Sequence, residues 1–172
     1  MFGLFPHQSS TEDDMNPTQL RELIRQVLMD IGLYSKDAVE LLMLTAAQES
    51  HCGYYIKQLR GPARGIFQME PTTEKDIWEN YLEYHKELAE IVTQLRVAYL
   101  YRSYDLWANL PYQIAMARIH YLRAPEKLPK YEDILGMAQY WKVYYNTVLG
   151  KGKVYEAVDN YKLYALRNQD TS

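Results

Sequence analysis

The sequence has few of the residues that cross-link or interrupt a chain, with one cysteine, eight glycines and seven prolines among 172 residues. A lone cysteine, Cys52, excludes an intramolecular disulfide and any zinc site built from cysteine pairs. No run approaches the roughly 20 apolar residues of a membrane-spanning helix. Residues 1–6 also lack the basic start and the long apolar core of a signal peptide. We therefore expect no membrane span and no signal peptide.

The chain has little excess charge of either sign, since it contains 19 basic and 22 acidic residues and its net charge is −3. This balance supplies no broad cationic field for phosphate backbones, so nucleic acid is not an expected partner. The apolar share of 48% and the length are typical of one globular domain that folds without metal or disulfide. Tyrosine is abundant, with 17 residues. Such amphipathic rings suit packing between helices or the lining of a groove for a polar ligand.

Apolar residues recur at helical spacing along most of the chain. Asn16 and Pro17 predict a helix start, and Gly32 its end. A second helix from about Ser35 has an apolar stripe that runs into Glu49. No window alternates like a strand, so the predicted fold class is all-α.

Four further helical stretches follow the first two. Thr73 and Asp76 predict an N-terminal cap, at which a helical stretch starts that extends to about residue 104 with a break near its middle. The others span about residues 111–123, 132–147 and 154–166. Residues 1–15 show no periodicity and are predicted to be a flexible arm, which leaves residues 16–172 as a single domain.

Glu49 is the first candidate for chemistry, because it ends an apolar helix and precedes a loop of about twenty residues rich in glycine and proline. Structureless loops of that length usually serve function. Burial raises the pKa of a carboxyl group, and a carboxylic acid that stays protonated near neutral pH can act as a general acid. The alternative is a solvated glutamate at a helix end.

A motif around this loop favours the general acid over the solvated glutamate. Gln48-Glu49-Ser50 is followed by Gly61-Pro62-Ala63-Arg64-Gly65-Ile66-Phe67-Gln68-Met69-Glu70-Pro71-Thr72-Thr73. The pattern resembles the soluble-type lytic transglycosylases and goose-type lysozymes, whose signature is E-S followed by G-x-x-x-G-L-M-Q-x-x-P-x-T. The resemblance covers about residues 35–125. It implies a lysozyme-like helical domain with a substrate loop after the catalytic helix, and cleavage of the β-1,4 bond after N-acetylmuramic acid in peptidoglycan. Glu49 would protonate the glycosidic oxygen.

The resemblance also implies substrate-binding residues. Ser50 would orient the glutamate or hold substrate, or it is only a helix-end hydroxyl. The floor of the groove would be formed by Gly65, Ile66, Phe67 and Gln68. Glycine lets the backbone approach a sugar closely, and an amide can both donate to and accept from an acetamido group. Gln68 equally suits a bond to the loop backbone, and Phe67 suits the core.

The chain departs from the family at its second landmark, an A-Y-N-A-G segment expected near residues 115–123. The asparagine and glycine are missing there. Tyr121 is a candidate hydroxyl donor toward Glu49 or a structural tyrosine. Tyr144 or Tyr145 on a later helix could supply the last aromatic hydroxyl of the family.

The resemblance implies glycan strands of peptidoglycan as the partner and no cofactor. No metal site is expected either, because the four histidines lack metal-ligand spacing. Residues 140–152 are similar to lysozyme-like proteins of tailed bacteriophages. This similarity implies a phage protein in the virion, beside other virion proteins, or in the host cytoplasm, acting on the periplasmic cell wall during penetration or lysis.

Two other functions remain open. A muramidase would hydrolyse the same bond with water and would need a second carboxylate, for which Glu70 and Asp76 are the candidates. A noncatalytic virion or wall-binding protein could keep the same scaffold.

Overall fold

The computed structural model describes residues 15–97, 102–146 and 152–167. The helices in chain order are α1 (Pro17–Asp30), α2 (Lys36–Ser50), α3 (Pro71–Asn80), η1 (Leu82–Tyr84), α4 (Lys86–Gln94), α5 (Arg102–Ala108), α6 (Leu110–Leu122), α7 (Ile134–Tyr144), α8 (Val154–Asn160) and η2 (Tyr161–Ala165). Within these ranges the only β interactions are isolated bridges in the loop after α2. The predicted all-α fold class is confirmed. Residues 1–14 of the predicted arm lie outside the described residues.

Several helices begin at the capping residues that the sequence suggests. The Asn16 side chain accepts hydrogen bonds from the amides of Thr18 and Gln19, with Pro17 in the first turn of α1. The hydroxyl of Ser35 accepts a bond from the Ala38 amide at the start of α2. These caps satisfy amides that have no partner within their helix. They fix where α1 and α2 begin, whereas α2 ends where His51 adopts the left-handed conformation.

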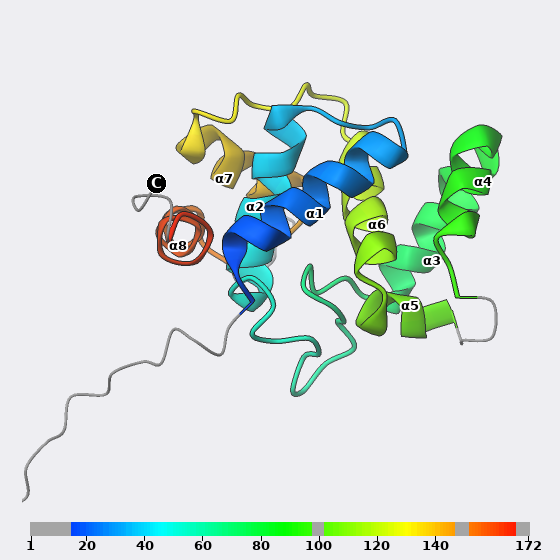
Figure 1. Ribbon diagram of the computed structural model, residues 1–172, viewed down its shortest axis with the longest axis horizontal. Helices are drawn as coiled ribbons and strands as arrows, with labels where there is room; N and C mark the ends of the chain where they lie inside the picture. The colour runs from blue at the N-terminus through cyan, green and yellow to red at the C-terminus, as the bar shows by residue number, and fades with distance from the viewer. Residues whose placement is uncertain (1–14, 98–101, 147–151, 168–172) are drawn as a thin grey trace, which may run out of the picture.

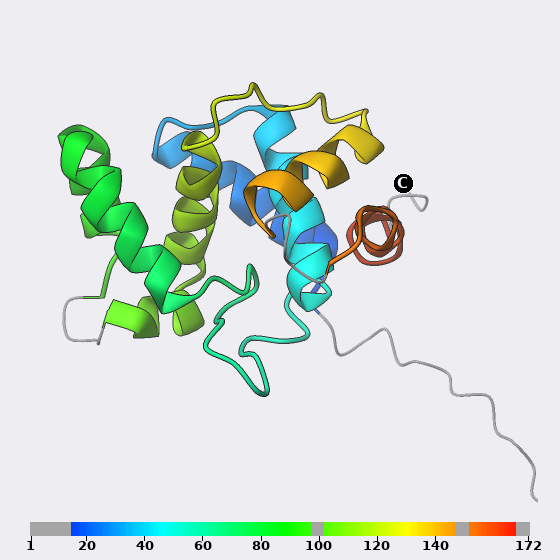
Figure 2. The same ribbon diagram turned by 180° about the vertical axis from the view of Figure 1, so that it is seen from behind.

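Helix α2 is the centre of the molecule. Its residues from Ala38 to Ala47 are buried on all sides. Figures 1 and 2 show α1 crossing one side of α2 and α7 the other, with α6 and α8 flanking it. Helices α3, α4 and α5 lie beyond α6, at the opposite end of the molecule from α8 (Figure 1). The last turn of α2, which holds Glu49, therefore opens onto the loop between α2 and α3.

A buried ion pair anchors α2 to its neighbours. Arg21 of α1 donates to Glu40 of α2 at 2.8 Å, and the Tyr161 hydroxyl of η2 donates to the same carboxylate at 2.7 Å. A buried charge of this kind is tolerated only when it is paired and hydrogen-bonded. Two elements that are distant in sequence, α1 and η2, are therefore held against the N-terminal half of α2.

The predicted stretch from residue 73 to about 104 differs from the observed structure. It is divided into α3, η1, α4 and α5, and α3 begins at Pro71 instead of Thr73. The predicted cap of Thr73 with Asp76 is wrong, because Pro71 already starts the helix and Asp76 accepts hydrogen bonds from Asn80 and Arg123. Helix α7 begins at Ile134, after an Asp133 cap, and ends at Tyr144, three residues before the expected end at about residue 147.

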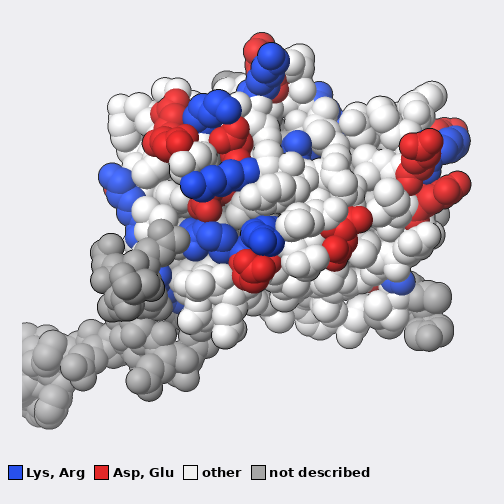
Figure 3. Space-filling model, turned by 45° about the horizontal axis from the view of Figure 1, so that its top comes forward, with Lys and Arg blue, Asp and Glu red and all other residues white. Residues whose placement is uncertain are grey.

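The surface carries both signs of charge. On the face in Figure 3, lysine and arginine side chains alternate with aspartate and glutamate, and wide areas are uncharged. Across the described parts of the chain, no helix has both the length and the apolar character that crossing a bilayer requires.

Candidate active site

Glu49 is half-buried in the last turn of α2 and is held by a tryptophan of α7. Trp141 donates from Nε1 to Glu49 Oε1 at 2.9 Å, and the indole ring is fully buried. Burial raises the pKa of Glu49 to about 7, while the bond from Trp141 lowers it by stabilising the ionised form. A carboxyl group with this pKa is present in both protonation states near neutral pH, so it can give a proton and take one back.

Ser50 joins the end of α2 to the loop that follows. Its hydroxyl lies close to two carbonyl oxygens, of Ile66 at 2.6 Å and of Ala46 at 3.1 Å, and accepts a bond from the Gly53 amide. The side chain is fully buried. Of the roles expected for Ser50, this buried position favours a structural one over direct contact with substrate. Its bonds position the loop relative to Glu49.

Gly65 turns the loop where no side chain fits. Its φ angle is +74°, a region that glycine adopts readily. A Cβ atom there would also collide with the Leu106 carbonyl oxygen and with the amide of Gln113. That amide accepts a bond from the Ile66 N–H at 2.9 Å. The sequence signal at Gly65 thus has a packing explanation: the loop backbone lies directly against α5 and α6.

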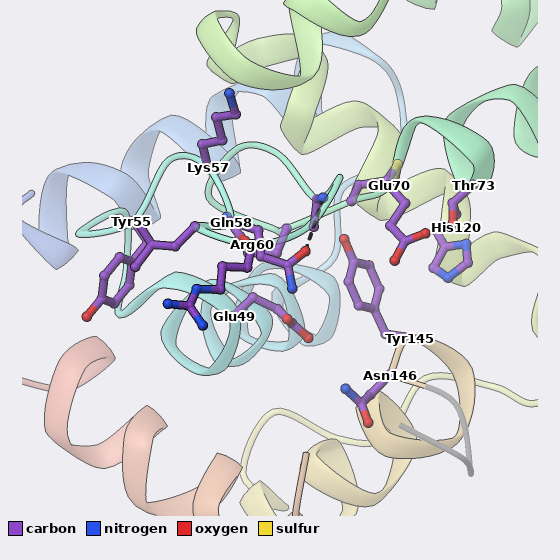
Figure 4. Close-up of a pocket in the computed structure, with 14 residues that line it drawn as sticks. Glu49, Tyr55, Lys57, Gln58, Arg60, Glu70, Thr73, His120, Tyr145 and Asn146 are labelled. Atoms are coloured by element: carbon purple, nitrogen blue, oxygen red, sulfur yellow. Dashed lines mark hydrogen bonds between the residues drawn. The ribbon is translucent and has the colours of Figure 1, made fainter. Parts of the chain in front are cut away.

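A cavity of about 1050 Å³ lies between the end of α2, this loop and the ends of three other helices (Figure 4). This volume is slightly above the usual range for ligand sites, about 300–1,000 Å³, so the cavity is large enough for a ligand of several rings. The lining residues are Glu49, Tyr55, Lys57, Gln58, Leu59, Arg60, Ala63, Gln68, Met69, Glu70, Thr73, His120, Tyr145 and Asn146.

The expected site residues divide into those that line the cavity and those that support it. Gln68 lines it, and its Nε2 also donates to the Gly65 carbonyl at 2.8 Å. Gly65, Ile66 and Phe67 are buried, with the latter two side chains 1% exposed. The side chains of Ile66 and Phe67 therefore pack in the core, which for Phe67 is the alternative that the sequence suggested, and only their backbone is left to form the floor of the groove.

The two expected tyrosines have different positions. Tyr145 lines the cavity, and its hydroxyl donates to the Phe67 carbonyl at 2.8 Å. Tyr121 is buried, and its hydroxyl shares a 2.8 Å hydrogen bond with Thr45, one turn before Glu49 on α2. No hydrogen bond joins Tyr121 to Glu49, so of the two roles expected for it the structure favours the structural one. Both tyrosines position the walls of the site through these bonds.

Sequence reasoning missed the role of Trp141. It lies 92 positions after Glu49, and its only signal was membership of an aromatic-rich helix. Glu70, on the rim of the cavity, was named as a possible second carboxylate, whereas Asp76 does not line the cavity.

His120 is a second missed residue of the cavity wall. Burial, together with the neighbouring Arg123, lowers the pKa of His120 to about 4, so the ring is neutral near pH 7. Its Nδ1 atom is buried and has no hydrogen-bond partner among the described residues. Over the same ranges, no three histidine, cysteine, aspartate or glutamate side chains are grouped so that they could hold a metal ion.

Comparison of the chain with family models, with curated proteins and with solved structures finds no significant match in any of the three. The functional conclusion therefore stands on the motif and on the geometry of the site.

Proposed function

We propose that the protein is a lytic transglycosylase that cleaves the β-1,4 bond between N-acetylmuramic acid and N-acetylglucosamine in peptidoglycan. The observation that carries the proposal is the state of Glu49: a half-buried carboxyl group with a pKa of about 7, fixed by Trp141 at the wall of a large cavity. Residues of the loop motif that bears the resemblance line the same cavity. A general acid needs this combination of raised pKa, fixed orientation and access to substrate.

The reaction requires one carboxyl group. Glu49 gives its proton to the glycosidic oxygen as the bond from the anomeric carbon to that oxygen breaks. The C6 hydroxyl of the same muramic acid residue then attacks the anomeric carbon, and the Glu49 carboxylate accepts the hydroxyl proton. The product has a 1,6-anhydro ring, no water is consumed, and the acid is regenerated. An internal nucleophile also has the rate advantage of proximity.

A muramidase is the second candidate, and Glu70 is the observation that favours it. Glu70 is an exposed residue on the rim of the same cavity as Glu49. An inverting or retaining glycosidase uses a second carboxylate to activate water or to attack the sugar. The products distinguish the two reactions, because anhydro ends are about 18 Da lighter than the reducing ends left by hydrolysis.

The test of the proposed function is digestion of purified peptidoglycan by the wild type, by Glu49→Gln and by Glu90→Gln. Glu90 is an exposed glutamate of α4 outside the cavity. We expect Glu49→Gln to lose at least about 100-fold in rate, the lower end of the contribution of general acid catalysis. Glu90→Gln should match the wild type. Full activity of Glu49→Gln would refute the assignment of the acid, and an inactive wild type on every wall preparation would favour the noncatalytic wall-binding alternative.

A further inference from the structure

The cavity beside Glu49 has unlike charges at its two ends. In the view of Figure 4, Arg60 lies beside Glu49, the side chain of Lys57 points away from both, and Glu70 and His120 lie on the other side of Glu49. All of these residues line the same cavity. A ligand that lies across Glu49 therefore meets cationic side chains at one end only.

Arg60 is held at the tip of a closed turn. The Gln58 amide N–H donates to the Ala63 carbonyl at 3.0 Å, and the Ala63 N–H donates to the side-chain oxygen of Gln58 at 3.3 Å. The Gln58 side chain also occupies the space that a Cβ on Gly61 would need. The turn thus fixes the backbone that presents Arg60 to the cavity.

Lys57 and Arg60 are exposed cations of this loop. Within the described residues, no carboxylate lies within ion-pair distance of Arg60 or Lys57. The Lys57 ammonium lies 6.0 Å from the centre of the Trp107 ring of α5, a contact that does not remove its charge. A guanidinium has a fixed fork of donors that matches a carboxylate with two parallel hydrogen bonds.

We propose that Arg60 forms a subsite that binds a carboxylate group of the substrate. The inference rests on the proposed function, because a glycan strand of peptidoglycan has carboxylates as its anionic groups. They belong either to the stem peptide or, where that peptide has been removed, to the free lactyl group of muramic acid. The subsite sets the direction in which a strand lies across Glu49.

The experiment measures kcat and KM for the wild type, Arg60→Gln and Arg60→Lys. Lys75→Gln, which changes an exposed lysine of α3 outside the cavity, is the matched control. The substrates are strands with stem peptides, strands stripped of peptides by an amidase, and both preparations with their carboxyl groups converted to methyl esters.

We expect Arg60→Gln to raise KM by about two- to fivefold with kcat unchanged. An exposed ion pair of this kind stabilises the bound substrate and the transition state equally. Arg60→Lys should recover part of this effect, and about 0.5 M salt should remove most of it. The effect should disappear on the esterified strands. An effect on peptide-bearing strands identifies the stem peptide as the source of the carboxylate, and an effect confined to stripped strands identifies the lactyl group.

An equal effect on esterified strands, or a KM of Arg60→Gln equal to that of the wild type on every substrate, would overturn the subsite. Failure of the proposed function has a different signature, because the wild type would then release no fragments from any of the four preparations.

Discussion

Replacement of Glu49 by glutamine should stabilise the protein in a pH-dependent way, whatever reaction the site performs. In the folded state the pKa of Glu49 is raised from 4.5 to about 7 by burial. Below pH 4.5 the carboxyl group is protonated in both the folded and the unfolded chain and has no effect on the difference between them. Between pH 4.5 and 7 the unfolded chain ionises first, so wild-type stability is lost as the pH rises.

The size of the effect follows from the pKa shift. One pKa unit corresponds to about 1.4 kcal/mol, so a rise from 4.5 to about 7 has an upper limit of about 3.5 kcal/mol. Glu49 is only half-buried and keeps part of its hydration, which reduces the expected difference to about 2–3 kcal/mol. The glutamine keeps the side-chain oxygen that accepts the bond from Trp141, so the variant loses the charge and little else.

The assay is urea denaturation of the wild type, Glu49→Gln and Glu90→Gln at several pH values between 4.5 and 8. The free energy of unfolding of Glu49→Gln should exceed that of the wild type by about 2–3 kcal/mol at pH 8 and by less than about 0.5 kcal/mol at pH 4.5. His120, whose pKa is lowered to about 4, makes stability fall as the pH falls below about 6.5. Because this effect is common to all three proteins, the quantity to compare at each pH is the difference in the free energy of unfolding between variant and wild type. A difference that does not change with pH would refute the buried state of Glu49, and Glu90→Gln should show none.

Three other substitutions test the framework around the acid. Trp141→Phe removes the hydrogen bond that favours ionised Glu49, so the alkaline limb of the pH–activity profile should move up by about one pH unit. The control is Trp78→Phe, which loses an indole hydrogen bond to Tyr112 and should leave the pH–activity profile unchanged. Gly65→Ala should lower the free energy of unfolding by more than about 3 kcal/mol, measured by urea denaturation, because the methyl group meets backbone and amide oxygens and the φ angle is positive. Ser50→Ala leaves the buried Ile66 carbonyl without this partner and should cost about 1–3 kcal/mol in the same assay; a loss below about 0.5 kcal/mol would show that the loop does not depend on it.

The sequence by itself determined the local features of this protein. Helix starts at Asn16 and Ser35, the apolar stripe that ends in Glu49, and the loop after it all depend on residues within one or two turns of each other. Capping and periodicity are short-range effects, so they can be read directly from the chain. The error at Thr73 has the same origin, because two short-range signals for a helix start lie next to each other there. The predicted cap was Thr73 with Asp76, whereas the helix begins two residues earlier, at Pro71.

Only the tertiary structure decided the environment of the acid. The bond from Trp141, the tyrosine hydroxyl on the Phe67 carbonyl and the fit of Gly65 against Gln113 join segments separated by 92, 78 and 48 positions. No spacing rule connects residues so far apart, because their meeting depends on how several helices pack around α2. Burial, which raises the pKa of Glu49, is likewise a property of that packing. The sequence could therefore identify Glu49 as the candidate acid, while the fold determined its pKa.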